Sequence, residues 1–333
     1  MSIRLSGNSP DSQARPHTIP ESENREKIAV ARLSIISNIS LTILKLIAGL
    51  LSGSISILSE AIHSGMDLIA SLIAYISVKR SGEPPDTQHA YGHGKYEDIS
   101  GLIEALLILI AGIIIISEAV KKVLSPHEFD SSLLLIGIIV MGISAVVNII
   151  VSSRLMKVAQ KTNSIALEAD AWHLRTDVYT SAGVMGGLII VYITKINLFD
   201  PLIAIAVAII IIKASIDLTK RSYQDLIDSS LSEEERKSIE ELVLEYKHEF
   251  VSMHNLRTRR AGPEVFIEFH IAVDGTMSVH DAHALVDTIE DALQGILPRA
   301  TITIHIESCE ENCNTCTAQC NEKRFLHRNK TEK

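Results

Sequence analysis

Long apolar runs, separated by short polar segments, fill most of the first 220 positions of the chain. Each run is long enough to cross ~30 Å of hydrocarbon as a helix that rises 1.5 Å per residue. Runs such as LLILIAGIIII have no polar face, which disfavours a soluble helical protein. The pattern therefore predicts six membrane-spanning helices after a disordered polar tail at 1–27. The predicted spans are 28–51, 55–79, 98–121, 131–154, 165–193 and 198–220.

The remainder of the chain has the patterns of a soluble domain, which we expect over 222–308. SEEERKSIEELVLEYKHEF opens with a helix-capping serine, and SVHDAHALVDTIEDALQGIL has amphipathic helical spacing. VSMHNLRTRRAG, EVFIEFHIAVDG and ATITIHIE have the alternation of strands. The order α-β-β-α-β predicts a small α+β domain with its helices on one sheet face. The other face suits pairing with a second copy.

Composition and charge agree with a membrane protein. Of the 333 residues 47% are hydrophobic and 4% aromatic, and the formal net charge is −9. Lys and Arg concentrate before the first span and after the second, fourth and sixth spans, and few lie in the other loops. Loops rich in Lys and Arg usually face the cytoplasm, so both termini are predicted to be cytoplasmic. These basic residues flank the membrane and lack interleaved aromatics, so nucleic acid is excluded as a partner.

Two of the predicted spans carry the same pair of polar residues. His63 and Asp67 lie four residues apart, as do His173 and Asp177, so each pair shares one helix face. Facing each other, the two helices supply two imidazoles and two carboxylates, enough for a tetrahedral metal site. Ionisable groups at membrane depth usually mark an ion or proton path. The alternative for a single pair is an interhelical hydrogen bond.

Each pair has an acidic neighbour one turn earlier, Glu60 and Asp170. Two interpretations stay open for these carboxylates. They orient the imidazoles or relay protons, or they lie near the helix end in water.

Five blocks give the chain a resemblance to a known family. They are SEAIHSGMD, PPDTQHAYGHGKYE, EADAWHLRTD, HNLRTRRAGPEVFIEFHI and ITIHIE, and they cover roughly residues 28 to 307. In this order and spacing the chain resembles the cation diffusion facilitators, which are homodimeric divalent-cation/proton antiporters. The resemblance implies six transmembrane helices followed by a cytoplasmic ferredoxin-like domain.

The resemblance places the family's transport site on His63, Asp67, His173 and Asp177. His at the first position accompanies zinc preference in the family, and imidazole with carboxylate suits Zn²⁺. Fe²⁺, Cd²⁺ and Co²⁺ stay open as substrates. A ligating His is neutral and a ligating Asp is ionised, so protons compete with the metal and can drive its release.

The loop between the second and third spans matches the family's loop site at Asp86, His89 and His93. A solvated polar loop is the alternative. Lys95 matches a family lysine that pairs with an aspartate after the sixth span, here Asp228, at the dimer hinge.

In the C-terminal domain the resemblance implies a two-metal site at five positions. Position 307 is Glu where the family often has a bridging Asp, which puts the bridging geometry in doubt. A metal here would join two protomers or stiffen the domain as a sensor. The implied ligands are His254, His270, His283, His305 and Glu307.

All four cysteines lie in the tail 309–333, spaced C-x3-C-x2-C-x3-C. In a reducing cytosol a thiolate metal site is favoured over disulfides, and a flexible redox-sensitive tail is the alternative. The four are Cys309, Cys313, Cys316 and Cys320.

These features predict a transporter that exports a divalent cation, Zn²⁺ above all, through the bacterial plasma membrane. No H-E-x-x-H motif or Walker A sequence occurs, which argues against a metalloprotease-like enzyme or an ATP-driven pump. A passive channel does not need such strong ligands, because tight binding slows release. A membrane-anchored metal sensor or scaffold without transport is the remaining alternative.

Overall fold

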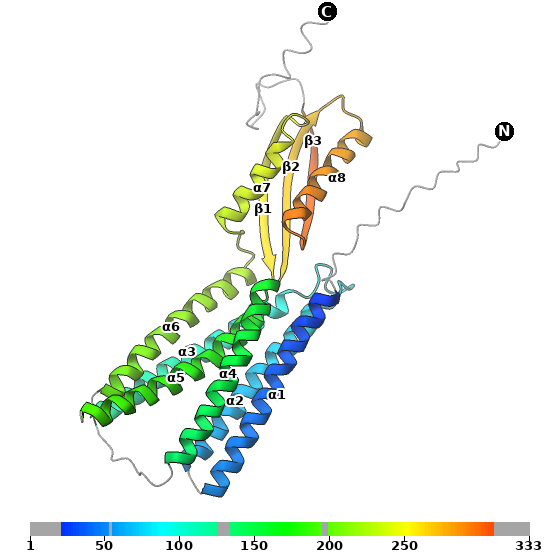
Figure 1. The fold of residues 1–333 in the computed structure, drawn as a ribbon. Helices are drawn as coiled ribbons and strands as arrows, with labels where there is room; N and C mark the ends of the chain where they lie inside the picture. Colours follow the sequence, from blue (N-terminus) through cyan, green and yellow to red (C-terminus); the bar gives the residue numbers. More distant parts are fainter. Residues whose placement is uncertain (1–20, 53–54, 125–133, 195–198, 310–333) are drawn as a thin grey trace, which may run out of the picture.

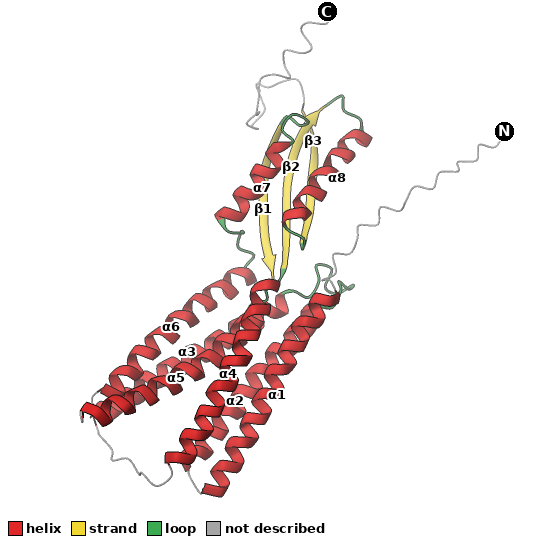
Figure 2. Ribbon diagram, viewed as in Figure 1, coloured by secondary structure: helices red, strands yellow, loops and turns green. Residues whose placement is uncertain are grey.

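A computed structural model describes residues 21–52, 55–124, 134–194 and 199–309, apart from the side chains of some helical residues. Six long helices form a bundle, and a small α+β domain stands at one end of it (Figures 1 and 2). The bundle helices are α1 (Glu21–Ser52), α2 (Ile55–Ser81), α3 (Lys95–Leu124), α4 (Leu134–Thr162), α5 (Ile165–Thr194) and α6 (Phe199–Leu226). The C-terminal domain comprises α7 (Glu233–Glu245), β1 (Ser252–Ala261), β2 (Glu264–Asp274), α8 (Val279–Ile296) and β3 (Ala300–Cys309).

Four helices of the bundle are long and apolar enough to cross a membrane, counted over the described residues alone. They lie within α1, α3, α4 and α6. The other two helices, α2 and α5, have 27 and 30 residues and carry the repeated His-x-x-x-Asp pairs. Six helices followed by a small sheet with helices confirm the predicted fold class.

Helix ends differ from the predicted ones mainly on the side of the C-terminal domain. The prediction of a disordered tail to residue 27 is wrong for 21–27, because α1 begins at Glu21 and Lys27 is fully buried. Similarly, α4 runs to Thr162 rather than 154. Hydropathy locates only the apolar part of a helix, and these helices continue as polar turns that pack on the C-terminal domain.

The C-terminal domain follows from its local signals. Ser232 and Glu235 form a reciprocal capping box at the start of α7. The sheet has the order β1-β2-β3, with β1–β2 antiparallel and β2–β3 parallel. Alternate residues of β2, such as Ile267 and Phe269, are buried with apolar residues of α7 and α8 in one core. The α-β-β-α-β prediction is thereby confirmed.

The junction between bundle and domain is tightly packed around two glycines. A side chain on Gly94 would clash with the carbonyl oxygen of Ala261, and Gly262 adopts a φ of +56°. The N–H of Gly262 donates to Asp98 Oδ2 at 2.8 Å. Arg299 from the domain contacts Glu23 of α1. The first turns of α1 and α3 are therefore fixed against the sheet.

A fully buried ion pair holds α1 to α3 below this junction. The ammonium of Lys27 contacts the carboxylate of Glu97, and both side chains have no exposed surface. Ser164, before α5, donates to the same carboxylate. The pair thus fixes three helix ends at one point.

We expect Lys27→Met to lower the apparent melting temperature of the detergent-solubilised protein strongly. The substitution leaves Glu97 as a buried charge without its cation, which costs about 3–5 kcal/mol. The double substitution Lys27→Met with Glu97→Gln should recover most of the loss. Arg25→Ala, which breaks an exposed pair with Glu21, is the control and should change little. Equal melting temperatures for Lys27→Met and the control would show that the buried ion pair does not contribute to stability.

Candidate metal centres

The first cluster joins α2 to α5 inside the bundle. Asp67, His173 and Asp177 each present a ligand atom, and these atoms all lie within 4.8 Å of one another. His173 Nε2 lies 3.1 Å from Asp67 Oδ1. The side chains of Asp67 and His173 are only 7% and 12% exposed. Two carboxylates and an imidazole at this separation can together surround one divalent cation.

The fourth predicted ligand, His63, lies on α2 one turn before Asp67, and its side chain is outside the described residues. The same holds for Glu60. The structure thus brings together three of the four predicted transport ligands and leaves the fourth as a prediction.

A polar network from three helices supports the cluster. Ser71 Oγ donates to Asp170 Oδ1 at 3.1 Å and accepts from Asn38 Nδ2 at 2.6 Å. Ser34 Oγ lies 3.2 Å from the same hydroxyl. Asp170 is fully buried, so the interpretation that it lies in water is wrong. The network fixes the turn of α5 that precedes His173.

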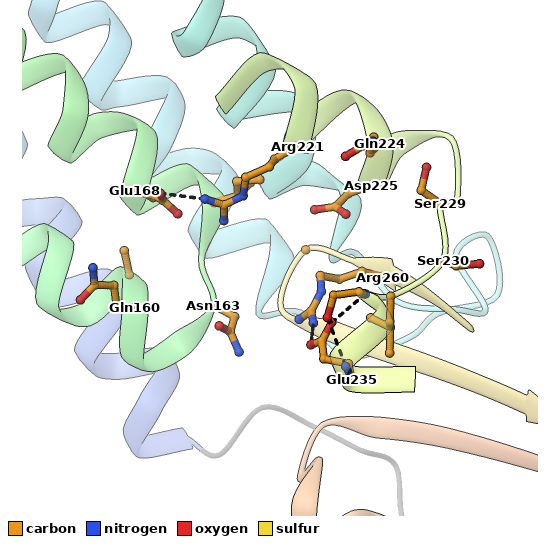
Figure 3. A pocket seen from close by; sticks show the side chains of 15 residues that line it. Gln160, Asn163, Glu168, Arg221, Gln224, Asp225, Ser229, Ser230, Glu235 and Arg260 are labelled. Atoms are coloured by element: carbon orange, nitrogen blue, oxygen red, sulfur yellow. Dashed lines mark hydrogen bonds and ion pairs between the residues drawn. The ribbon is translucent and has the colours of Figure 1, made fainter. Parts of the chain in front are cut away.

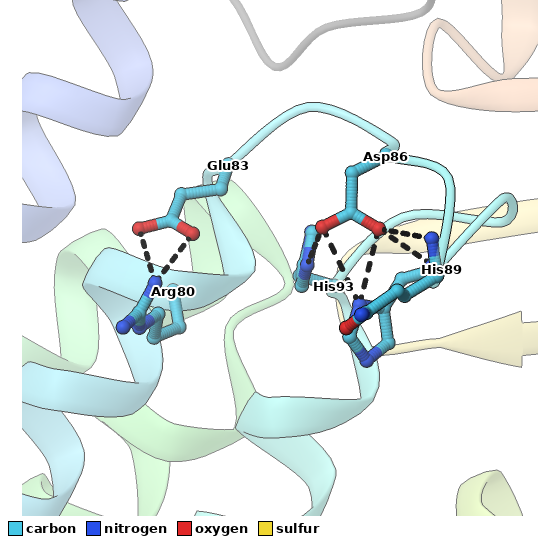
Figure 4. A network of polar contacts seen from close by, with 6 residues as sticks. Arg80, Glu83, Asp86, His89 and His93 are labelled. Carbon is cyan, nitrogen blue, oxygen red and sulfur yellow. Dashed lines mark hydrogen bonds and ion pairs between the residues drawn. The ribbon is translucent and has the colours of Figure 1, made fainter.

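The second cluster lies in the loop between α2 and α3 (Figure 4). Asp86 Oδ1 accepts the N–H groups of Gln88 and His89, and backbone donation by His89 holds the pKa of Asp86 below its usual range. His89 Nδ1 and His93 Nε2 lie 3.2 and 3.3 Å from the Asp86 carboxylate. The loop therefore preorganises one carboxylate between two imidazoles.

This loop is also fastened to the C-terminal domain. Tyr91 packs edge-on against Phe266 of β2, and the Arg259 guanidinium lies 5.0 Å from the Tyr91 ring centroid. Just after the loop, Lys95 forms an ion pair with Asp228 at 3.0 Å. Arg259 contacts Asp228 as well, at 3.2 Å. The predicted Lys95–Asp228 pair is thus present, close to the loop cluster.

The third cluster lies on the sheet, where three strands bring histidines side by side. His254, His270 and His305 occupy paired positions in the register of β1, β2 and β3. Glu307 Oε1 lies 2.8 Å from His270 Nδ1, and Glu307 Oε2 lies 3.3 Å from His254 Nε2. Hydrogen bonding from His270 lowers the pKa of Glu307. Glu307 therefore reaches two histidines with separate oxygens, despite its greater length than Asp.

The structure of one protomer leaves His283 out of this cluster. It lies on α8, where its Nδ1 contacts Asp287 Oδ2 at 3.0 Å. Cys309 ends β3, and the other three tail cysteines, Cys313, Cys316 and Cys320, lie outside the described residues. The tail site stays a prediction.

Two neighbours of the clusters escaped the sequence analysis. Asn255 sits at a β-bulge with a φ of +60°, and its Nδ2 lies 3.4 Å from His270 Nε2. Glu104 is fully buried in α3. A lone acidic residue within the apolar run LIEALLILI was the available signal for Glu104. Asn255 had none.

A polar pocket of about 580 Å³ lies between the bundle and the C-terminal domain (Figure 3). Its two arginines are already paired. Arg221 contacts Glu168 at 2.9 Å, and Arg260 contacts Glu235 at 2.7 Å. The pocket therefore offers no concentrated charge of one sign, and we assign no ligand to it.

Comparison with models of known protein families identifies the family of the chain. Residues 31–227 match the cation efflux transmembrane domain, and residues 231–309 match the cytoplasmic domain of cation efflux proteins. The chain belongs to the cation efflux family. The resemblance to cation diffusion facilitators is confirmed, and the chain is a multi-pass membrane protein of a transporter family.

Relatives in this family match along most of their length. An uncharacterized transporter of Synechocystis, sll1263, is 34% identical over 84% of this chain and 90% of its own. The cation-efflux pump FieF of Shewanella oneidensis is 31% identical over 83% and 92%. A solved structure of CzrB, a candidate zinc transporter, is 39% identical over 24% of this chain and all of its own, with a TM-score of 0.24.

Glu264 makes the junction of this family member sensitive to pH. It begins β2 next to Gly92 of the loop, and burial raises its pKa from 4.5 to about 7. A raised carboxyl pKa stabilises the folded junction fully below pH 4.5, and this contribution is lost as the pH rises through about 7. We expect Glu264→Gln to flatten the fall in apparent melting temperature across this window. Glu268→Gln on the same strand is the control, and an unchanged slope in Glu264→Gln would contradict the assignment.

The sheet cluster predicts a metal-binding contribution from His270. We expect His270→Ala to weaken zinc binding to the purified protein by more than the roughly 10–100-fold that loss of an outer partner costs. The substitution removes the histidine that contacts Glu307 most closely. Metal-competition titration measures the affinity, and His248→Ala, outside the cluster, is the matched control. Equal affinities in the two variants would remove His270 from the site.

Proposed function

We propose that this cation efflux protein exports Zn²⁺ in exchange for protons, by alternating access in a homodimer. The observation that carries the proposal is the convergence of Asp67, His173 and Asp177 between two helices of the bundle. His63, which precedes Asp67 by one turn, is the fourth ligand in this proposal. Ligands of this strength at membrane depth suit a carrier that binds its substrate at every cycle.

The donor set favours zinc as the substrate. Imidazole nitrogen combined with carboxylate oxygen suits Zn²⁺ in four-coordinate geometry, whereas magnesium and manganese prefer oxygen alone. Fe²⁺, Cd²⁺ and Co²⁺ accept the same ligands and are the alternative substrates. FieF relatives carry the name cation-efflux pump, which supports export as the direction.

Proton exchange follows from the chemistry of the same residues. His173 Nε2 must give up any proton to bind a cation, and Asp67 must be ionised. The 3.1 Å contact between them is a hydrogen bond that a bound cation would replace. Protons arriving from the outer side restore this bond and displace the cation. The proton gradient thereby drives export.

The remaining clusters act as regulatory sites in this proposal. The sheet cluster of His254, His270, His305 and Glu307, with His283 contributed on dimerisation, binds zinc and stiffens the C-terminal domain. The loop cluster and the Lys95–Asp228 pair then transmit that state to the bundle. Residues 1–20 and 310–333 flank the two domains. Both termini face the cytoplasm, and the membrane is the bacterial plasma membrane.

We expect wild-type protein in lipid vesicles to move Zn²⁺ when a pH gradient is imposed, and Asp177→Ala to abolish this flux. The substitution removes one of the carboxylates that neutralise the cation. Zinc flux is followed with an entrapped fluorescent indicator. Asp217→Asn, an exposed carboxyl on α6, is the control and should retain transport.

Other outcomes decide between the alternatives. Flux of iron without zinc keeps the site and overturns the ion assignment. Zinc flux that is indifferent to the pH gradient rules out antiport. An absence of flux for both ions, with zinc still bound by the protein, favours a sensor or scaffold.

A further inference from the structure

Glu104 is a buried carboxyl group with only one partner. It lies on α3, in the apolar part of the bundle, with no exposed surface. Ser100, one turn earlier on the same helix, donates to Oε1 at 3.3 Å. Oε2 is buried and accepts no hydrogen bond from any described residue. Such a group is costly to hold as an anion.

The charged surroundings of Glu104 come from the transport cluster. On α5, Asp170 and His173 lie within electrostatic range of Glu104, and Asp67 of α2 lies within electrostatic range of Asp170. From α6, Ser215 donates to the carbonyl oxygen of the neighbouring Ala105. Lys213 and Asp217 of α6 are exposed and face away. Glu104 and Asp170 are therefore two buried acids beside one imidazole.

Asp170 has hydroxyl partners but no cationic one. Its Oδ1 accepts from Ser71, the Ser34 hydroxyl lies beside the same carboxyl group, and its Oδ2 is buried without a hydrogen bond among the described residues. Neither acid forms an ion pair with a Lys or Arg of the described chain. Two carboxyl groups in one low-dielectric space cannot both ionise cheaply.

Glu97, on the same helix, shows which partners a buried ionised carboxylate has in this protein. It lies two turns before Glu104, it is equally buried, and it has both the Lys27 ammonium and the Ser164 hydroxyl as partners. Glu104 has a single neutral donor. The contrast indicates that Glu104 is not held as a permanent anion.

We propose that Glu104 and Asp170 together form a proton-binding site, separate from the metal ligands, that loses one proton when a cation enters the neighbouring cluster. A divalent charge at Asp67, His173 and Asp177 stabilises both carboxylates by Coulomb attraction. The carboxyl O–H bond breaks, its electron pair stays on oxygen, and the proton leaves for water. Departure of the cation reverses the step. The inference rests on the proposed exchange of metal for protons.

The test counts protons released per Zn²⁺ bound. Calorimetric titration of the full-length protein in two buffers of different ionisation enthalpy gives this number for wild type, Glu104→Gln and Asp170→Asn. We expect each variant to bind zinc at the transport cluster and to release about one proton fewer than wild type. Asp217→Asn is the control and should release the wild-type number. Glu104→Asp should restore part of the release.

Results that contradict the proton site differ from results that contradict the transport proposal. Wild-type proton numbers in both Glu104→Gln and Asp170→Asn would overturn the proton site. If Glu104→Gln does not elute as a folded species, the Asp170→Asn titration decides alone. The vesicle flux of the wild-type protein tests transport separately. If the protein binds zinc and releases these protons but moves no zinc, the proton site stands and the antiport function is overturned.

Discussion

A charged side chain inside this bundle needs a partner of opposite charge. The pairs that result fix which helices pack against each other. Asp67 and His173 join α2 to α5 through a contact of 3.1 Å, and Lys27 and Glu97 join α1 to α3. Buried charges without partners cost several kcal/mol, so these contacts restrict which helices can pack together. The same demand suits the first site to the proposed transport, because a divalent cation there would neutralise the carboxylates of Asp67 and Asp177.

Helix α3 runs from the loop cluster, past the junction with the C-terminal domain, to the bundle cluster. It begins at Lys95, two residues after the loop ligand His93, and continues past Asp98, which accepts the backbone N–H of Gly262 in the C-terminal domain. Two turns further lies Glu104, beside the transport cluster. A single rigid helix thus touches the loop, the domain junction and the membrane site. Coupling between sites needs an element whose position both sites bias, and the position of α3 suits it to that role.

The sequence predicted the parts of this protein that periodicity and local chemistry determine. Six apolar runs, the capping serine of α7 and the alternation of the strands led to the correct fold class. Periodicity could not find the start of α1 at Glu21, because polar turns that pack on another domain resemble a solvated tail. The sequence left two interpretations of Asp170 open for the same reason, since burial of a polar residue depends on tertiary neighbours such as Ser71. The sheet cluster required the register of three strands, which no single segment contains.

Glu at position 307 illustrates that the residue type alone does not determine the geometry of a site. A longer side chain was expected to disturb a bridging position. Here β3 places the carboxylate between His254 and His270, and each oxygen faces a different imidazole. The bulge lies directly after His254, between it and Arg257, and Asn255 within it adopts a φ of +60°, while His254 itself stays paired with His270. The greater length of Glu therefore does not prevent its two carboxylate oxygens from contacting two different histidines of the sheet.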